Sequence, residues 1–101
     1  MDRRNSKFFA EETKAVGKRI AEFLKMANVS QEEIATECFP GVNKQLIYRR
    51  LAGRNEITVG EYLAICKYLE VDYGLFLYED EFESDAYELA NEIRGMRGRY
   101  L

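Results

Sequence analysis

The sequence has no histidine and no tryptophan, and it has only one proline and two cysteines. Without histidine, the chain lacks the general base of Ser-His-Asp and Cys-His nucleophile pairs and the imidazole ligand of many metal sites. Cys38 and Cys66 are too far apart for a CxxC motif, and two thiolates alone do not complete a zinc site. Their spacing favours two buried thiols and leaves a disulfide open. We therefore expect neither an enzyme nor a bound metal or cofactor.

Long apolar runs are missing as well. The chain shows no apolar segment of the secretory-signal type near its start, and no run approaches the ~20 apolar residues that span a bilayer. Its 101 residues, of which 47% are hydrophobic and 33% charged, suit one globular domain. We expect a cytoplasmic protein that makes no contact with a membrane.

Acidic and basic residues are unevenly distributed along the chain. The net charge of −3 argues, taken alone, against a nucleic-acid-binding protein. However, residues 78–92 contain seven acids and no base, whereas residues 43–54 contain no acid and four bases, Lys44, Arg49, Arg50 and Arg54. The acidity therefore belongs to the tail, and the body carries a local basic patch. A solvated helix face is the alternative explanation of such a patch.

Apolar residues at helical spacing predict an all-α fold. Helices are expected over residues 8–28, 31–38, 44–52, 59–69 and 86–95, with a short helix after Asp72 that carries Leu75 and Phe76. No alternating run is long enough for a strand. We expect residues 8–77 to form one domain, followed over residues 78–101 by an acidic linker and a C-terminal helix.

Capping residues mark where three of these helices begin. Ser30 with Glu33, and Thr58 with Glu61, have the spacing of capping boxes, and Asn43 is a favourable N-cap. The helix over 59–69 is expected to bury the apolar residues Val59, Tyr62, Leu63, Ile65, Cys66 and Leu69.

The two short helices over 31–38 and 44–52 are typical of a helix-turn-helix arrangement. On a helical wheel of the second, the apolar residues Leu46, Ile47 and Leu51 fall on one side. The other side carries Lys44, Gln45, Tyr48 and Arg49. Glutamine can pair with adenine in the major groove, and lysine or arginine can pair with guanine. We therefore predict that these four side chains contact DNA bases.

The segment Ser30-Gln31-Glu32-Glu33-Ile34-Ala35 resembles the start of the second helix in phage repressor and Cro-type (XRE-type) helix-turn-helix regulators. The stretch RRLAGRNEITVGEYLAICKYLEVDYGLF, from Arg49 to Phe76, resembles the end of that family's recognition helix, its loop and its fourth helix. The resemblance covers about residues 16–77. It departs from the family in a turn lengthened by Phe39-Pro40 and in Arg50, where an apolar residue is commoner.

The resemblance implies a lambda-repressor-like five-helix domain that binds a double-stranded DNA operator. Such a protein regulates transcription, usually as a repressor in a bacterium or phage. The resemblance also implies that Gln31, at the start of a helix, contacts phosphate. Asn43 and Arg54 are the further candidates for phosphate contact. The alternative is a helix-turn-helix module or antitoxin that acts on a protein partner, which the acidic tail favours.

A homodimer is expected because one helix-turn-helix touches only a few base pairs and the family usually pairs two. The surface is expected in the C-terminal part of the chain, where apolar residues exceed what the core needs. These residues are Leu75, Phe76, Phe82, Leu89 and Ile93. The alternative, in which the last helix folds onto its own domain or is disordered, stays open.

Overall fold

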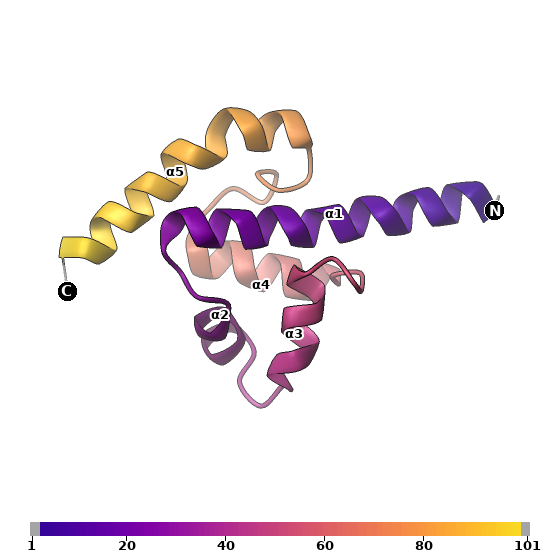
Figure 1. Cartoon of the computed structure of the whole chain (residues 1–101), viewed down its shortest axis with the longest axis horizontal. Helices are drawn as coiled ribbons and strands as arrows, with labels where there is room; N and C mark the ends of the chain where they lie inside the picture. The colour runs from indigo at the N-terminus through magenta and orange to yellow at the C-terminus, as the bar shows by residue number, and fades with distance from the viewer. Residues whose placement is uncertain (1–2, 100–101) are drawn as a thin grey trace.

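The structure, a computed structural model, describes the backbone of residues 3–99 and the side chains of residues 9–97. Within this range it contains five helices and no strand: α1 (Arg3–Ala27), α2 (Gln31–Cys38), α3 (Lys44–Leu51), α4 (Val59–Leu69) and α5 (Glu79–Arg99). α1 crosses the middle of the molecule, with α5 along one side and α2 and α3 on the other (Figure 1). The predicted all-α fold is confirmed. None of the described helices is both long and apolar enough to cross a membrane.

Side-chain caps begin α2, α3 and α4 at the predicted places. Ser30 Oγ accepts a hydrogen bond from the Glu33 amide at 3.0 Å, and Asn43 Oδ1 accepts one from the Gln45 amide at 2.9 Å. Thr58 and Glu61 form the full capping box. Each cap satisfies a backbone N–H that a helix start leaves unpaired, which is why these residues fix the helix starts.

The core lies where α1 meets the other helices. Phe23 of α1 and Phe76 are fully buried, and their rings meet edge to face with centroids 5.3 Å apart. Phe76 also packs against Tyr62 of α4 and Phe82 of α5. This aromatic cluster therefore joins α1, α4 and α5 into one core.

α1 and α3 approach each other closely at Gly17. A Cβ added there would lie 2.1 Å from the carbonyl oxygen of Arg50, which is backbone and cannot move away cheaply. Glycine is the residue that permits this contact. The position of α3 on α1 therefore depends on Gly17.

Two predictions for the C-terminal part are wrong. The expected linker over 78–85 is helical from Glu79 onward, where α5 begins with three acids in its first turn and the helix dipole favours negative charge. The expected short helix after Asp72 is instead a set of turns, closed by bonds from the Leu75 amide to the Asp72 carbonyl and from the Leu77 amide to the Gly74 carbonyl. The Asp72 side chain accepts from the Gly74 amide rather than capping a helix.

The burial expected on α4 is wrong for two residues. Val59 is 75% exposed and Leu63 is 42% exposed, whereas Ile65 and Cys66 are buried as expected. Val59 and Leu63 are four residues apart and therefore share one side of the helix. That side lines an open groove whose other wall includes Thr13 and Val16 of α1.

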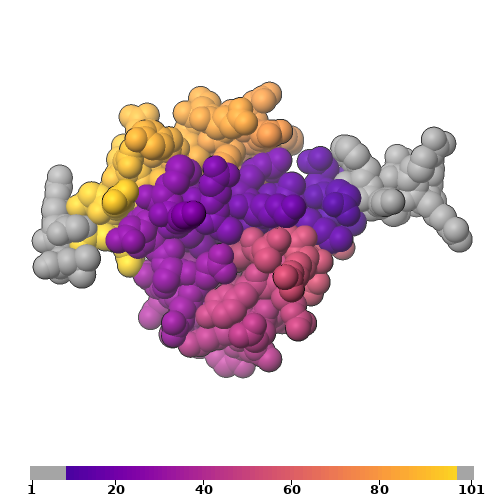
Figure 2. All heavy atoms as spheres, viewed as in Figure 1, coloured from indigo at the N-terminus to yellow at the C-terminus, as the bar shows by residue number. Residues whose placement is uncertain are grey.

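The expected dimer surface is corrected for three of its five residues. Leu75, Phe76 and Phe82 are buried in the chain's own core, and Leu89 and Ile93 pack partly against it. For the residues of α5 the reason is that this helix lies against α1 (Figure 2), with Phe82, Ala86 and Ala90 buried. The last helix thus folds onto its own domain, the alternative that the sequence left open.

Candidate nucleic-acid interface

α3 presents the polar side that the sequence predicts. Ile47 and Leu51 are almost fully buried and fix the back of the helix against the body. Lys44, Gln45 and Arg49 are exposed on the other side. Tyr48 is half-buried and packs against the core, so it has less freedom to reach a ligand than the other three.

Arg50 belongs to the structure of the domain rather than to its exposed face. Its Nε lies 3.0 Å from Glu61 Oε1, and both side chains are largely buried. Because Glu61 is in the first turn of α4, this ion pair ties the C-terminal end of α3 to the start of α4. The basic patch that faces solvent is therefore made by Lys44, Arg49 and Arg54.

The predicted phosphate contacts lie at helix starts and ends. Gln31 is the first residue of α2 and is half-buried, and Asn43 caps α3. The Asn43 oxygen is occupied by the cap, so its amide NH₂ is the group left to donate to a phosphate. Arg54 is exposed and follows Gly53, whose φ of +74° turns the chain beyond α3. Asn43 and Arg54 therefore lie at the two ends of α3, and Gln31 lies at the start of the neighbouring helix α2.

Lys44 is engaged in an exposed ion pair. Its Nζ lies 3.2 Å from Glu32 Oε1, and the two side chains are 48% and 71% exposed. Solvent screens such a pair, which contributes only about 0–1 kcal/mol. The contact shows that the N-terminal ends of α2 and α3 are neighbours, and it is weak enough for a phosphate or base to replace it.

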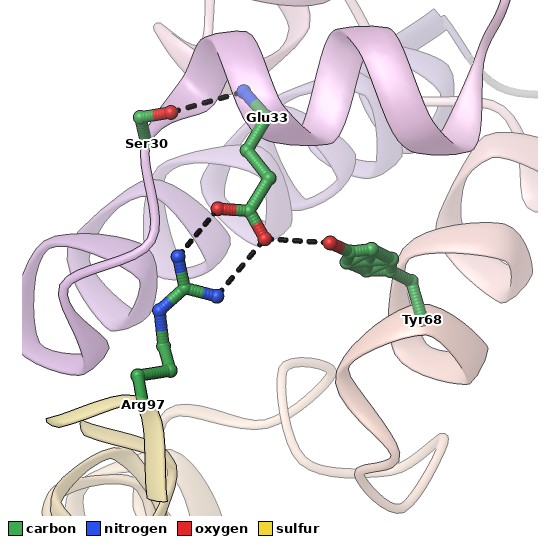
Figure 3. Close-up of polar contacts among 4 residues, drawn as sticks. All are labelled: Ser30, Glu33, Tyr68 and Arg97. Atoms are coloured by element: carbon green, nitrogen blue, oxygen red, sulfur yellow. Dashed lines mark hydrogen bonds and ion pairs between the residues drawn. The ribbon is translucent and has the colours of Figure 1, made fainter. Parts of the chain in front are cut away.

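Sequence reasoning missed a cluster centred on Glu33 (Figure 3). Arg97 of α5 donates two hydrogen bonds to the Glu33 carboxylate, from Nη1 to Oε2 at 3.0 Å and from Nη2 to Oε1 at 2.6 Å. The hydroxyl of Tyr68 on α4 donates to Oε2 at 2.5 Å. The expected capping box is thus only half present, because Ser30 accepts from the Glu33 amide but the Glu33 side chain turns to Arg97.

The contacts within this cluster shift the pKa values of Glu33, Arg97 and Tyr68. Hydrogen bonds from Arg97 lower the pKa of Glu33, and the same contact raises the pKa of Arg97. The hydrogen bond to the Glu33 carboxylate raises the pKa of Tyr68 to about 12. Glu33 is consequently ionised at neutral pH, with its charge balanced by Arg97 across a bidentate contact. No spacing in the sequence connects Glu33 with Arg97, 64 positions further on.

Two acids on α2 are thus paired with bases. Glu32 contacts Lys44, and Glu33 contacts Arg97. An unpaired carboxylate beside the start of α2 would repel a phosphate that approaches Gln31. By neutralising the charge of Glu33, Arg97 removes a source of repulsion for an anion that approaches the start of α2. Arg97 does this from α5, far along the chain.

The acidic residues of α5 lie away from this face. The seven acids between residues 78 and 92 are all exposed. α5 runs along one side of α1, and α2 and α3 occupy the opposite side (Figure 1). The negative charge that dominates the net charge is therefore separated from the basic face of α3.

The cysteines offer no reactive centre. Both are free thiols, with Cys66 buried and Cys38 part-buried. Burial raises the pKa of Cys38 to about 11 and also raises the pKa of Cys66, so neither forms a thiolate readily at neutral pH. Across the described side chains, no three potential ligands gather to hold a metal ion.

Comparisons with protein-family models, with curated proteins and with solved structures find no match for this chain. The XRE-type resemblance consequently stays a prediction from the sequence. The exposed face of α3 and the distribution of charge around it are the observations that bear on function.

Proposed function

We propose that the protein binds double-stranded DNA through the exposed face of α3 and acts as a transcriptional regulator, a repressor of the XRE type. The observation that carries this proposal is that polar and apolar side chains lie on opposite sides of α3. Lys44, Gln45 and Arg49 are exposed on one side, while Ile47 and Leu51 are buried on the other. A short helix held rigidly on a domain, with such a face outward, suits insertion into a major groove.

Phosphate contacts supply affinity and position the helix. The start of α2 offers backbone N–H groups and the Gln31 side chain, and Arg54 offers a charge at the other end of α3. Base contacts then supply sequence preference. Gln45 and Arg49 are the strongest candidates because both are exposed and no described ion pair or side-chain hydrogen bond engages them. Lys44 exchanges its contact with Glu32 for one with DNA.

A protein partner is the second candidate function. It is favoured by the seven exposed acids of the N-terminal part of α5, which form a surface fit for a basic protein. DNA cannot approach that surface without repulsion. The two functions therefore predict different contact surfaces, α3 for DNA and α5 for a basic partner.

Binding to duplexes selected from a random pool tests the proposal. The affinity of the wild-type protein should fall steeply as salt rises, because bound phosphates release counterions. Gln45→Ala should lose about 1–3 kcal/mol on the selected site and discriminate less between sites. Gln31→Ala should weaken all duplexes about equally.

Asn91→Ala is the matched control, since it removes an exposed amide from α5. It should bind as the wild type does. Wild-type binding that is absent or independent of salt would contradict the proposal. So would a Gln45→Ala variant with unchanged affinity and preference.

A further inference from the structure

An apolar groove of about 700 Å³ lies between α1, the start of α4 and the turns over residues 73–78. Six large hydrophobic side chains that line it are between 42% and 75% exposed: Phe9, Val59, Leu63, Tyr73, Leu77 and Tyr78. The described side chains include ten exposed large hydrophobics, so most of them gather here. Pockets for small molecules are mostly apolar and enclose ~300–1,000 Å³, so the groove has the size and the lining of a ligand site.

The walls of the groove are held in place. The Tyr62 hydroxyl donates to the carbonyl of Tyr73. The guanidinium of Arg19 donates to the carbonyl of Phe76 at 3.0 Å and to that of Leu77 at 3.4 Å. These bonds fix the turns that form one wall against α1 and α4. The groove is therefore a preformed surface, and binding there requires little ordering of the chain.

The charge of the groove is negative. Among the described residues that line it, Glu12 of α1 is the one charged residue, and none is a base. Glu12 is exposed, and no described ion pair or side-chain hydrogen bond engages it. Two further exposed acids, Asp72 and Glu79, border the turns over residues 73–78 along the chain. An occupant with a positive charge therefore complements this surface, whereas an anion is repelled.

Hydroxyl groups in the lining add hydrogen-bond acceptors. Thr13 Oγ1 donates to the Phe9 carbonyl at 2.8 Å, and the Tyr62 hydroxyl donates to the Tyr73 carbonyl. With their protons engaged, these two hydroxyls can offer an occupant only lone pairs. The first turn of α4 borders the groove as well, and its capping box already engages two backbone amides there. These polar groups favour a cation or an N–H donor over an anion.

Aromatic rings strengthen the preference for a cation. Phe9, Tyr73 and Tyr78 line the groove and are all more than half exposed. The face of an aromatic ring carries negative charge, and a cation placed over it is attracted. The side chains that make the groove apolar thus attract the same sign of charge as Glu12 does.

We propose that the groove binds a hydrophobic organic cation, an apolar molecule of small-ligand size with one positive charge. Its apolar body packs on Val59, Leu63 and Leu77, and its charge is balanced by Glu12 and the aromatic faces. None of the described lining residues belongs to α3. The site is therefore independent of the proposed contact with DNA and can be tested without DNA.

Tetraphenylphosphonium and tetraphenylborate test the proposal, because these two ions have nearly the same size and shape and opposite charges. Each is titrated into the isotope-labelled full chain while amide chemical shifts are followed. The phosphonium should bind saturably, with a dissociation constant of about 10–100 μM, and shift Glu12, Thr13 and residues 57–63 and 73–78. The borate should bind to these residues about 10-fold more weakly or not at all.

A matched pair of variants tests the role of charge in the groove. Leu63→Lys and Leu63→Glu both replace the same exposed apolar side chain with a good helix former, and they introduce opposite charges. Leu63→Glu should bind the phosphonium about 10-fold more tightly than Leu63→Lys. Glu12→Gln should weaken binding by about 2- to 5-fold, the size expected for one exposed charge pair.

Tyr87→Lys is the control outside the groove, because Tyr87 is an exposed aromatic residue of α5 beside its acids. It should bind the phosphonium as the wild type does. Phosphonium shifts centred on residues 79–92 would overturn the proposal, because they would indicate general attraction to the acidic helix. Equal affinities for the two ions, equal affinities of the two Leu63 variants, or no saturable binding below about 1 mM would overturn it as well.

Discussion

α3 and α5 lie on opposite sides of α1, and both combine a buried apolar stripe with a charged outer surface. Their outer charges have opposite signs. α3 exposes Lys44 and Arg49, whereas the charged residues that the N-terminal part of α5 exposes are all acids. The net charge of −3 is a sum over the whole chain, so it hides the opposite signs of these two faces. The charge of an individual face is therefore the better guide to a partner of this protein.

The two helices are attached to the body in different ways. α3 has eight residues and depends on the close contact at Gly17 and on the Arg50–Glu61 pair. α5 has 21 residues and is anchored by Phe82 and small alanines, and its far end reaches α2 through Arg97. The acidic helix thus supports the helix pair that carries the basic face.

The largest effect is expected from breaking the core that joins the two sides. Phe76→Ala should lower the free energy of unfolding by about 3–5 kcal/mol, because Phe76 is fully buried among three other aromatic rings. Tyr87→Ala, which removes an exposed ring from α5, should change it by less than about 0.5 kcal/mol. Urea titrations would measure both, and equal effects would mean that Phe76 does not join α5 to the body.

A smaller effect is expected where α3 meets α1. Gly17→Ala should destabilise by about 1–3 kcal/mol, because its Cβ collides with the Arg50 carbonyl and must push α3 aside. Its affinity for DNA should fall as well, since α3 is displaced. Gly95→Ala adds a Cβ into open space on α5 and should stabilise by up to about 1 kcal/mol. Gly17→Ala that is as stable as the wild type would rule out the close contact.

The smallest effect is expected from the link between α5 and α2. Arg97→Ala should lower the free energy of unfolding by about 1 kcal/mol, a value limited by solvent because the Arg97 side chain is 38% exposed. Arg94→Ala removes an exposed arginine one turn earlier and should have no measurable effect. If Arg94→Ala lowered the free energy of unfolding equally, the effect would come from the loss of any positive charge on α5 and not from the contact with Glu33.

The Arg97 effect should depend on pH in one direction. The pKa of Glu33 is lowered in the folded protein, so the contact stabilises the fold above the ordinary pKa of about 4.5. This stabilisation is lost as pH falls through the lowered value and Glu33 takes up a proton. The difference in unfolding free energy between wild type and Arg97→Ala should therefore be full at pH 7 and shrink below about pH 4.5. A difference that grows in acid would contradict the ion pair.

Local signals in the sequence were enough to place α2, α3 and α4. Ser30, Asn43 and Thr58 act on the next few residues, so their caps can be predicted without knowing the fold. The burial of Ile47 and Leu51 followed from helical spacing in the same way.

Long-range contacts could not be predicted from these signals. The acids of residues 79–85 look like a linker until Phe82 and Ala86 are seen to pack on the body. Similarly, Leu63 has the spacing of a buried residue, and its exposure depends on which helices cover α4. Glu33 and Arg97 meet only because α5 lies along α1 and reaches α2.

Amide chemical-shift mapping with a short DNA duplex at low ionic strength tests most directly whether α3, and not α5, is the face that binds DNA. Phosphate contacts persist on any sequence, so the operator need not be known. Shifts should concentrate at Gln31, over residues 43–49 and at Arg54, while residues 79–92 stay unchanged. Shifts centred on α5, or no shifts in the presence of saturating duplex, would contradict DNA binding by the α3 face.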